Sequence, residues 1–368
     1  MLKKMLISIG IAAFLVGCGG SGSSPSTSSG GTGGSTGGDV LAQTRDYVAT
    51  QQPGDVWAWT LNASTFTGAN ETLGNDYSGS LAHLPSGFSL LTIDSTNDPD
   101  VAVGSKAYAV EIPGTCILVR PAGGDEVMPI IGTGLGSNPT AETMSMNWIT
   151  VPSANFSLET DDAFGVAHFT RTETGYSLAI DFGKLTYESG DLEEGMGGTL
   201  VVRDGRYVVD EEEEGGDTVF GLQRSGVFMA DNGPNLGGII GMNVPTSPLP
   251  WSDIAGRNFI GMLVKANRSQ LVKCSAGVDP GTLRGYGLFS EEAIASGTPD
   301  DPDSGVILSL IGEASPGLYT VYLTGLEPGA SDEKMFVIAG IVEGKCVLFG
   351  FGGNEHDGTY NVLLVEKS

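Results

Sequence analysis

Basic residues are scarce in this sequence. Its 368 residues include 18 lysines and arginines against 44 aspartates and glutamates, so the formal net charge is -26. Such a surface repels a phosphate backbone, and direct attraction to anionic lipid headgroups needs a cluster of basic residues. The charge balance therefore excludes nucleic acid as a partner and leaves proteins, glycans and cations.

Catalytic and cofactor motifs are also scarce. The three histidines, His83, His168 and His356, show no paired spacing, and no H-E-x-x-H motif occurs. No G-x-S-x-G nucleophile elbow occurs after residue 38. We therefore predict a protein that is not an enzyme and that needs no metal or other cofactor. A glycoside hydrolase remains an alternative, because its two carboxylates need only the right separation in space.

No apolar run is long enough to span a membrane, and the longest one, residues 5–16, stands at the start of the chain. Residues 5–16 rise about 18 Å as a helix, which is too little to cross a hydrocarbon core of about 30 Å. Lys3 and Lys4 precede this run, as in a secretion signal. Leu15-Val16-Gly17-Cys18 at its end resembles the lipobox of bacterial lipoproteins.

The lipoprotein resemblance implies a lipid anchor. Residues 1–17 would be removed, the sulfur of Cys18 would carry a diacylglyceryl group, and its new amine would be acylated. Two or more acyl chains make membrane attachment stable. Gly19 stands where an aspartate commonly marks retention in the inner membrane, so the outer membrane is expected, with the face left open. Loss of Lys3 and Lys4 leaves 18 - 2 = 16 basic and 44 acidic residues, a net charge of -28.

A linker follows the proposed anchor. The segment 18–38 consists of Cys18 and twenty further residues that are all Gly, Ser, Thr or Pro, a composition that stays disordered. The twenty residues 19–38 span about 25 Å as a flexible coil. The folded body is thus expected to stand clear of the lipid headgroups.

The body has the pattern of an all-β protein. Short runs rich in Val, Ile, Thr, Tyr and Phe are separated by Gly, Pro, Asn and Asp, and no alternation with long helices appears. Asp204-Gly205 between two apolar runs is the strongest hairpin signal. We predict tandem antiparallel β-sandwich or small β-barrel domains over 39–152, 153–250 (packing with the first) and 251–368, with one short helix over 39–51.

Two registers of a weak internal repeat compete. In the first, Gly114, Gly226 and Gly344 each precede an apolar strand, a turn and a further strand. In the second, Asp98-Pro99-Asp100 and Pro113-Gly114 match Asp301-Pro302-Asp303 and Pro316-Gly317 at one offset of 203 residues. The two registers are incompatible, and chance similarity of glycine-turned hairpins is the third possibility.

Cysteines supply the second candidate site. An oxidising envelope allows a disulfide between Cys274 and Cys346, which lie in the same third of the chain. Cys116 is then left over, and its neighbours Ile117, Leu118 and Val119 indicate a buried thiol. No C-x-x-C spacing favours a metal site.

Ligand-binding candidates are the tryptophans and two acidic loops. Trp57 and Trp59 share one face of a strand, and with Trp148 and Trp251 they either stack on sugars or fill the core. The acidic loops, 94–100 and 300–303, either hold calcium or form ordinary solvated turns.

The combined expectation is an outer-membrane, lipid-anchored protein that binds a protein or glycan ligand without catalysis. The bilayer is its other partner, through acyl chains on Cys18. The alternatives are a structural component of a periplasmic envelope assembly and a hydrolase of envelope polysaccharide.

Overall fold

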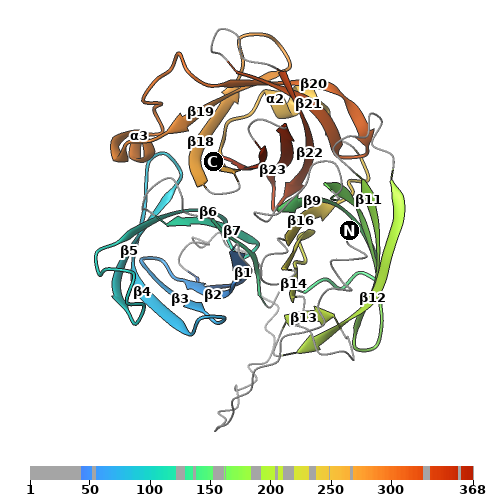
Figure 1. The fold of residues 1–368 in the computed structure, drawn as a ribbon, viewed down its shortest axis with the longest axis horizontal. Coiled ribbons are helices and arrows are strands. Elements are labelled where there is room, and N and C mark those ends of the chain that lie inside the picture. The colour runs from blue at the N-terminus through green and yellow to red at the C-terminus, as the bar shows by residue number, and fades with distance from the viewer. Residues whose placement is uncertain are drawn as a thin grey trace, which may run out of the picture.

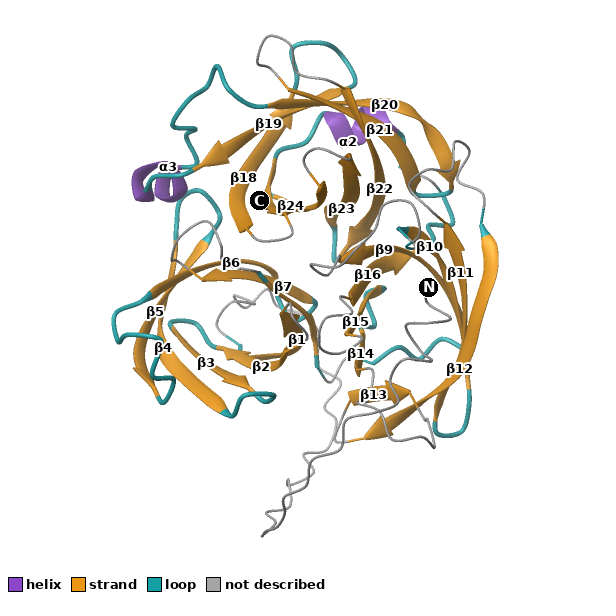
Figure 2. Cartoon of the chain, in the orientation of Figure 1, coloured by secondary structure: helices purple, strands orange, loops and turns teal. Residues whose placement is uncertain are grey.

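The chain forms three closed antiparallel barrels of eight strands each, drawn in Figures 1 and 2. The computed structural model describes residues 43–51, 55–121, 129–135, 138–151, 161, 163–183, 192–203, 206–209, 219–231, 238–247, 249–265, 268–325, 332–354 and 358–367. The predicted signal (1–17), Cys18 and the predicted linker lie outside the described residues. The expected tandem all-β architecture is confirmed, in the form of barrels rather than sandwiches.

Each barrel follows the chain from one strand to its neighbour. The first contains β1 (Arg45–Gln51), β2 (Asp55–Leu61), β3 (Thr65–Asn70), β4 (Asn75–His83), β5 (Ser89–Thr96), β6 (Lys106–Ile112), β7 (Cys116–Pro121) and β8 (Ile130–Gly134). The second contains β9 (Thr143–Val151), β10 (Phe164–Arg171), β11 (Gly175–Gly183), β12 (Glu193–Arg203), β13 (Arg206–Val209), β14 (Val219–Leu222), β15 (Val227–Asp231) and β16 (Gly238–Asn243). The third contains β17 (Phe259–Lys265), β18 (Arg268–Ala276), β19 (Thr282–Leu288), β20 (Val306–Ser315), β21 (Leu318–Gly325), β22 (Asp332–Val342), β23 (Lys345–Asn354) and β24 (Gly358–Glu366). Two short helices, α2 (Trp251–Ala255) and α3 (Glu291–Ser296), belong to the third part of the chain.

Pairing of the first strand with the last closes each barrel. β1 pairs with β8, β9 with β16 and β17 with β24, all antiparallel. Because successive side chains point to opposite faces of a strand, every second residue enters the barrel interior. Three separate clusters of buried side chains fill these interiors. They include Trp59 and Phe66 in the first barrel, Trp148 and Phe228 in the second, and Phe259 and Cys346 in the third.

A fourth and larger buried cluster lies between the barrels. It combines outward-facing side chains from all three, among them Leu118, Ile240 and Phe349. The contacts between barrels join β8 to β14 and β15, β9 to β22 and β23, β16 to β22, and β6 to β24. Strands at this junction are buried on both faces, as β8 and β15 are at every position. The three barrels therefore share one core, around which Figure 1 shows them arranged side by side.

Three equivalent hairpins meet at this junction. The turns between β6 and β7, β14 and β15, and β22 and β23 contain Gly114, Gly226 and Gly344, whose φ angles of 71°, 83° and 78° favour glycine. The Ser225 hydroxyl donates its hydrogen bond to the Glu343 carboxylate and so accepts one from the Thr115 hydroxyl (Oγ to Oγ1, 3.4 Å). The turns thus touch across the centre of the molecule.

The hairpin positions decide between the two repeat registers. Gly114, Gly226 and Gly344 each lie between the sixth and seventh strands of a barrel. In the competing register, Pro113-Gly114 joins a sixth strand to a seventh, whereas Pro316-Gly317 joins a fourth to a fifth. The first register therefore relates equivalent parts of the three barrels.

The prediction of a helix over residues 39–51 is wrong for the part of this segment that the structure describes. Residues 45–51 form β1, and residues 39–42 lie outside the described range. Tyr47 and Ala49 face the interior of the first barrel, while Val48 packs against Val208 and Val219 of the second. Pairing with β2 and β8 on both sides outweighs the local helical pattern, because only a strand closes the barrel.

The first predicted domain boundary, at residue 152, lies too late. β9 was expected to end the first domain, but it pairs with β10 and β16 and so begins the second barrel. The hairpin predicted around residues 204–205 is confirmed by its flanks, since Arg203 of β12 pairs with Arg206 of β13. The turn residues themselves lie outside the described range.

Candidate ligand site in the third barrel

The four tryptophans are buried, as the core interpretation predicted. Trp57 and Trp59 lie inside the first barrel, with ring centroids 5.7 Å apart and nearly parallel planes. Trp148 fills the second barrel, and Trp251 of α2 donates its indole N–H to the carbonyl of Gly281 at 2.8 Å. None of them presents an open ring face on the surface for a sugar.

The acidic loops act as turns. The carboxylate of Asp98 accepts hydrogen bonds from the Tyr77 hydroxyl and the Asp100 backbone N–H. Asp300 accepts the backbone N–H groups of Phe289 and Ser290, and hydrogen bonding to Ser290 and Phe289 lowers the pKa of its carboxyl. Within the described ranges, no group of three or more His, Cys, Asp or Glu side chains is arranged to hold a metal ion.

The expected disulfide is not formed. Cys116, Cys274 and Cys346 are free and buried. Cys274 lies on β18 and Cys346 on β23. The strand order between them is β18, β17, β24, β23: Cys274 of β18 pairs with Phe259 of β17, which in turn pairs with Glu366 of β24. Three strand spacings of about 4.8 Å thus separate the two cysteines along the barrel wall, beyond the Cα separation of about 7 Å that a disulfide tolerates. Burial raises the pKa of the Cys274 thiol to about 12.

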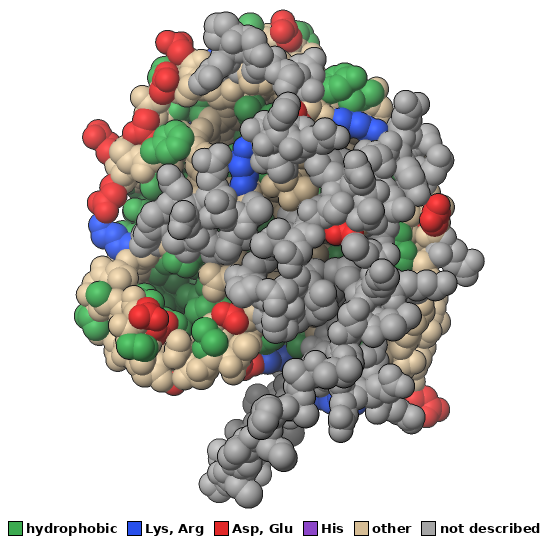
Figure 3. Space-filling model, in the orientation of Figure 1, with side chains coloured by type: hydrophobic (Ala, Val, Ile, Leu, Met, Phe, Trp, Pro, Cys, Tyr) green, Lys and Arg blue, Asp and Glu red, His purple; other side chains and the backbone are tan. Residues whose placement is uncertain are grey.

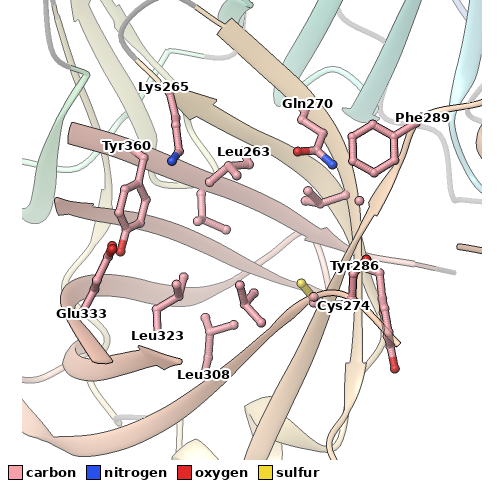
Figure 4. Close-up of a pocket in the computed structure, with 17 residues that line it drawn as sticks. Leu263, Lys265, Gln270, Cys274, Tyr286, Phe289, Leu308, Leu323, Glu333 and Tyr360 are labelled. Atoms are coloured by element: carbon pink, nitrogen blue, oxygen red, sulfur yellow. The ribbon is translucent and has the colours of Figure 1, made fainter. Parts of the chain in front are cut away.

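A pocket of about 280 Å³ lies inside the third barrel. Figure 4 shows side chains from strands around the barrel converging on it. Its walls are mainly apolar, and Cys274 contributes its thiol. The apolar residues are Leu263, Val272, Val306, Leu308, Leu323 and Val362.

Polar groups gather at one end of this pocket. Lys265 of β17 stands opposite Tyr360 of the adjacent strand β24. Gln270 enters the pocket from β18, on the other side of β17, and Glu333 enters from β22, as Figure 4 shows. Lys265 makes no ion pair with a described residue. An ammonium and an amide therefore face an apolar chamber. Basic groups are rare in this chain, and on the face drawn in Figure 3 acidic side chains are spread along the rim.

Glycines make room for the pocket. A Cβ on Gly285 would lie 3.2 Å from the Cys274 sulfur and 3.1 Å from a Val306 methyl group. A Cβ on Gly287 would lie 1.8 Å from the Gln270 amide nitrogen and 2.9 Å from the Phe289 ring. The missing side chains at 285 and 287 leave space for the chamber and for the two neighbours that border it.

The chain matches no known protein family, curated protein or solved structure. The site must therefore be interpreted from its own chemistry. Among the described residues, no helix combines the length and apolar character that crossing a bilayer requires.

The pocket has the composition of a small-molecule binding site. Ligand sites in small barrels are mostly apolar, with a few polar groups that orient the ligand. Among the described lining residues only Glu333 is a carboxylate, whereas a glycoside hydrolase needs two. The arrangement fits a small molecule with an apolar body and a polar head near Lys265 and Gln270.

Sequence reasoning missed these residues, although one signal was present. Of the predicted site residues, only Cys274 borders the pocket; Cys346 lies elsewhere in the same interior. Gly285-Tyr286-Gly287 places two glycines on the inward face of one strand, and such a pattern marks a site where something approaches the backbone. Lys265 and Gln270 carry no comparable signal. They are neighbours in the hairpin of β17 and β18, but the chamber that they face is completed by distant strands, such as β22 with Glu333.

Proposed function

We propose that this chain is a lipid-anchored envelope protein whose third barrel binds a small apolar molecule with an anionic head. The observation that carries the binding proposal is the apolar chamber with Lys265 and Gln270 directed into one end. A cation in a partly dehydrated pocket attracts an anion more strongly than it would in water. The lipobox supports the anchor, and the outer membrane is the proposed address.

Octanoate and the neutral octanol test the binding proposal. We expect octanoate to bind the full chain more tightly in isothermal titration calorimetry, because only its head is charged. Lys265→Met keeps the apolar stem and should weaken octanoate binding about tenfold, a loss of roughly 1.4 kcal/mol, with octanol unchanged. Gly285→Leu should fill the chamber and abolish binding of both.

Lys106→Met is the matched control for charge. Lys106 lies on the first barrel and pairs with Glu291, away from the pocket residues. Its loss should leave octanoate binding unchanged. Equal octanoate loss in the two lysine variants would mean general charge attraction, and persistent binding to Gly285→Leu would place the ligand elsewhere.

Cys18→Ser tests the anchor. Without a thiol, no thioether-linked diacylglyceryl group can form, so the protein should lose its acyl mass and leave the membrane fraction. Intact-mass spectrometry and cell fractionation measure the two effects. A variant that stays membrane-bound at the original mass rules out lipidation at Cys18.

A further inference from the structure

The third barrel has an incomplete seam between β19 and β20. These strands pair at only four positions, from Thr282 with Ser309 to Gly285 with Val306. β20 then continues, and Leu310–Ser315 pairs with β21 on its other side. Within the described part of the chain, this half of β20 therefore has a neighbouring strand on one side only. Figure 1 places β20 on the outer rim of the molecule.

The seam is bordered by exposed apolar side chains. Leu310 and Ile311 are 43% and 45% exposed, and Tyr322 on β21 is 44% exposed. A groove of about 430 Å³ lies beside them, and Glu313, Thr320 and Lys334 contribute to its lining along with Ile311 and Tyr322. An edge strand with a concave, partly apolar surface next to it is a site where an extended chain can add to a sheet.

We propose that Leu310–Ser315 docks an extended segment of a partner protein in which basic and apolar residues alternate. The segment would take the place that β19 leaves empty and would hydrogen-bond to the β20 backbone. Side chains on one face of an added strand point the same way, so apolar residues would cover Ile311 and Tyr322. Basic residues are expected because Glu313 stands on this edge and the chain after residue 17 has a net charge of -28.

A second copy of this chain fits the edge less well. Two antiparallel Leu310–Ser315 segments would bring together two identical edges, and neither edge has a basic residue between positions 310 and 315 to pair with Glu313. The net charge adds a long-range repulsion between copies, which a basic partner would convert into attraction.

A fluorescein-labelled heptapeptide of alternating lysine and valine is the probe. We expect saturable binding to the full chain in fluorescence anisotropy, and none for a glutamate–valine peptide or for one with proline at its centre. Ile311→Lys should weaken binding at least tenfold. Tyr322→Ser, which leaves the charge unchanged, should also weaken it.

Val278→Lys is the matched control, because Val278 is 88% exposed in the turn between β18 and β19. It makes the same charge change away from the edge and should alter affinity less than twofold. Equal weakening by Val278→Lys and Ile311→Lys would show diffuse attraction and overturn the proposal. So would a dimer in sedimentation velocity that Ile311→Lys dissociates, since a second copy would then occupy the edge.

Discussion

Replacing Glu111 with alanine is expected to destabilise the protein by about 3–5 kcal/mol. The Glu111 carboxylate forms a two-pronged ion pair with Arg45, at 2.9 Å and 3.1 Å, inside the first barrel. The two side chains are only 6% and 3% exposed. Removal of the carboxylate takes from the buried guanidinium the counter-charge and the two hydrogen bonds that Glu111 supplies, and a buried charge is costly when its pairing is reduced.

The Tyr47 hydroxyl extends this network. It donates to Glu111 at 2.8 Å and accepts the backbone N–H of Gly114 at 2.8 Å. Burial, with the Glu111 charge, raises the pKa of the Tyr47 phenol, so the hydroxyl stays neutral and remains a donor. Glu111→Ala therefore also removes the acceptor of the Tyr47 hydroxyl, the group that joins β1 to the central hairpin turn at Gly114.

Urea unfolding followed by tryptophan fluorescence measures the loss. The surface pair of Lys106 and Glu291, with side chains 38% and 72% exposed, supplies the control, and Glu291→Gln should cost less than about 1 kcal/mol. The double variant Arg45→Met with Glu111→Leu removes both charges and should be much more stable than Glu111→Ala. Similar losses for Glu111→Ala and Glu291→Gln would contradict the prediction.

Phe336→Ala is expected to cost about 3–5 kcal/mol and to weaken the whole assembly. Phe336 of the third barrel faces outward and lies 4.1 Å, centroid to centroid, from Phe164 of the second. Both rings are fully buried in the cluster between the barrels. The cavity would therefore open at the shared core, where it removes contacts that hold two barrels together.

A double-mutant cycle with Phe164→Ala isolates the contact between barrels. The coupling of the two rings should be about 0.5–1.5 kcal/mol. Phe289→Ala, at a ring 67% exposed, is the control and should cost little. Tryptophans lie in every barrel, so single-tryptophan variants can report each one, and we expect their unfolding transitions to coincide. Separate transitions, with Phe336→Ala shifting only the third barrel, would show that the central core does not couple them.

Local sequence signals succeeded where neighbouring residues interact. The Asp204-Gly205 pattern located a hairpin because its two strands follow each other directly along the chain. The repeated glycines at 114, 226 and 344 marked equivalent turns because positive φ is a local requirement. The prediction of a helix over 39–51 failed because β1 pairs with β8, about 80 residues away along the chain.

An acidic, all-β body of antiparallel hairpins could be predicted from the sequence, because charge, strand periodicity and turn residues act locally. Long-range strand pairing was needed to place β1 at the closure of a barrel, β9 in the second barrel, and Cys274 and Cys346 on strands that are not neighbours. Packing also decided which apolar residues face another barrel rather than an interior, and that the hairpin with Lys265 and Gln270 faces a chamber completed by β20, β21 and β22. The reason is physical: barrel closure and barrel packing join strands that are distant in the chain, and no local pattern encodes which of them will meet.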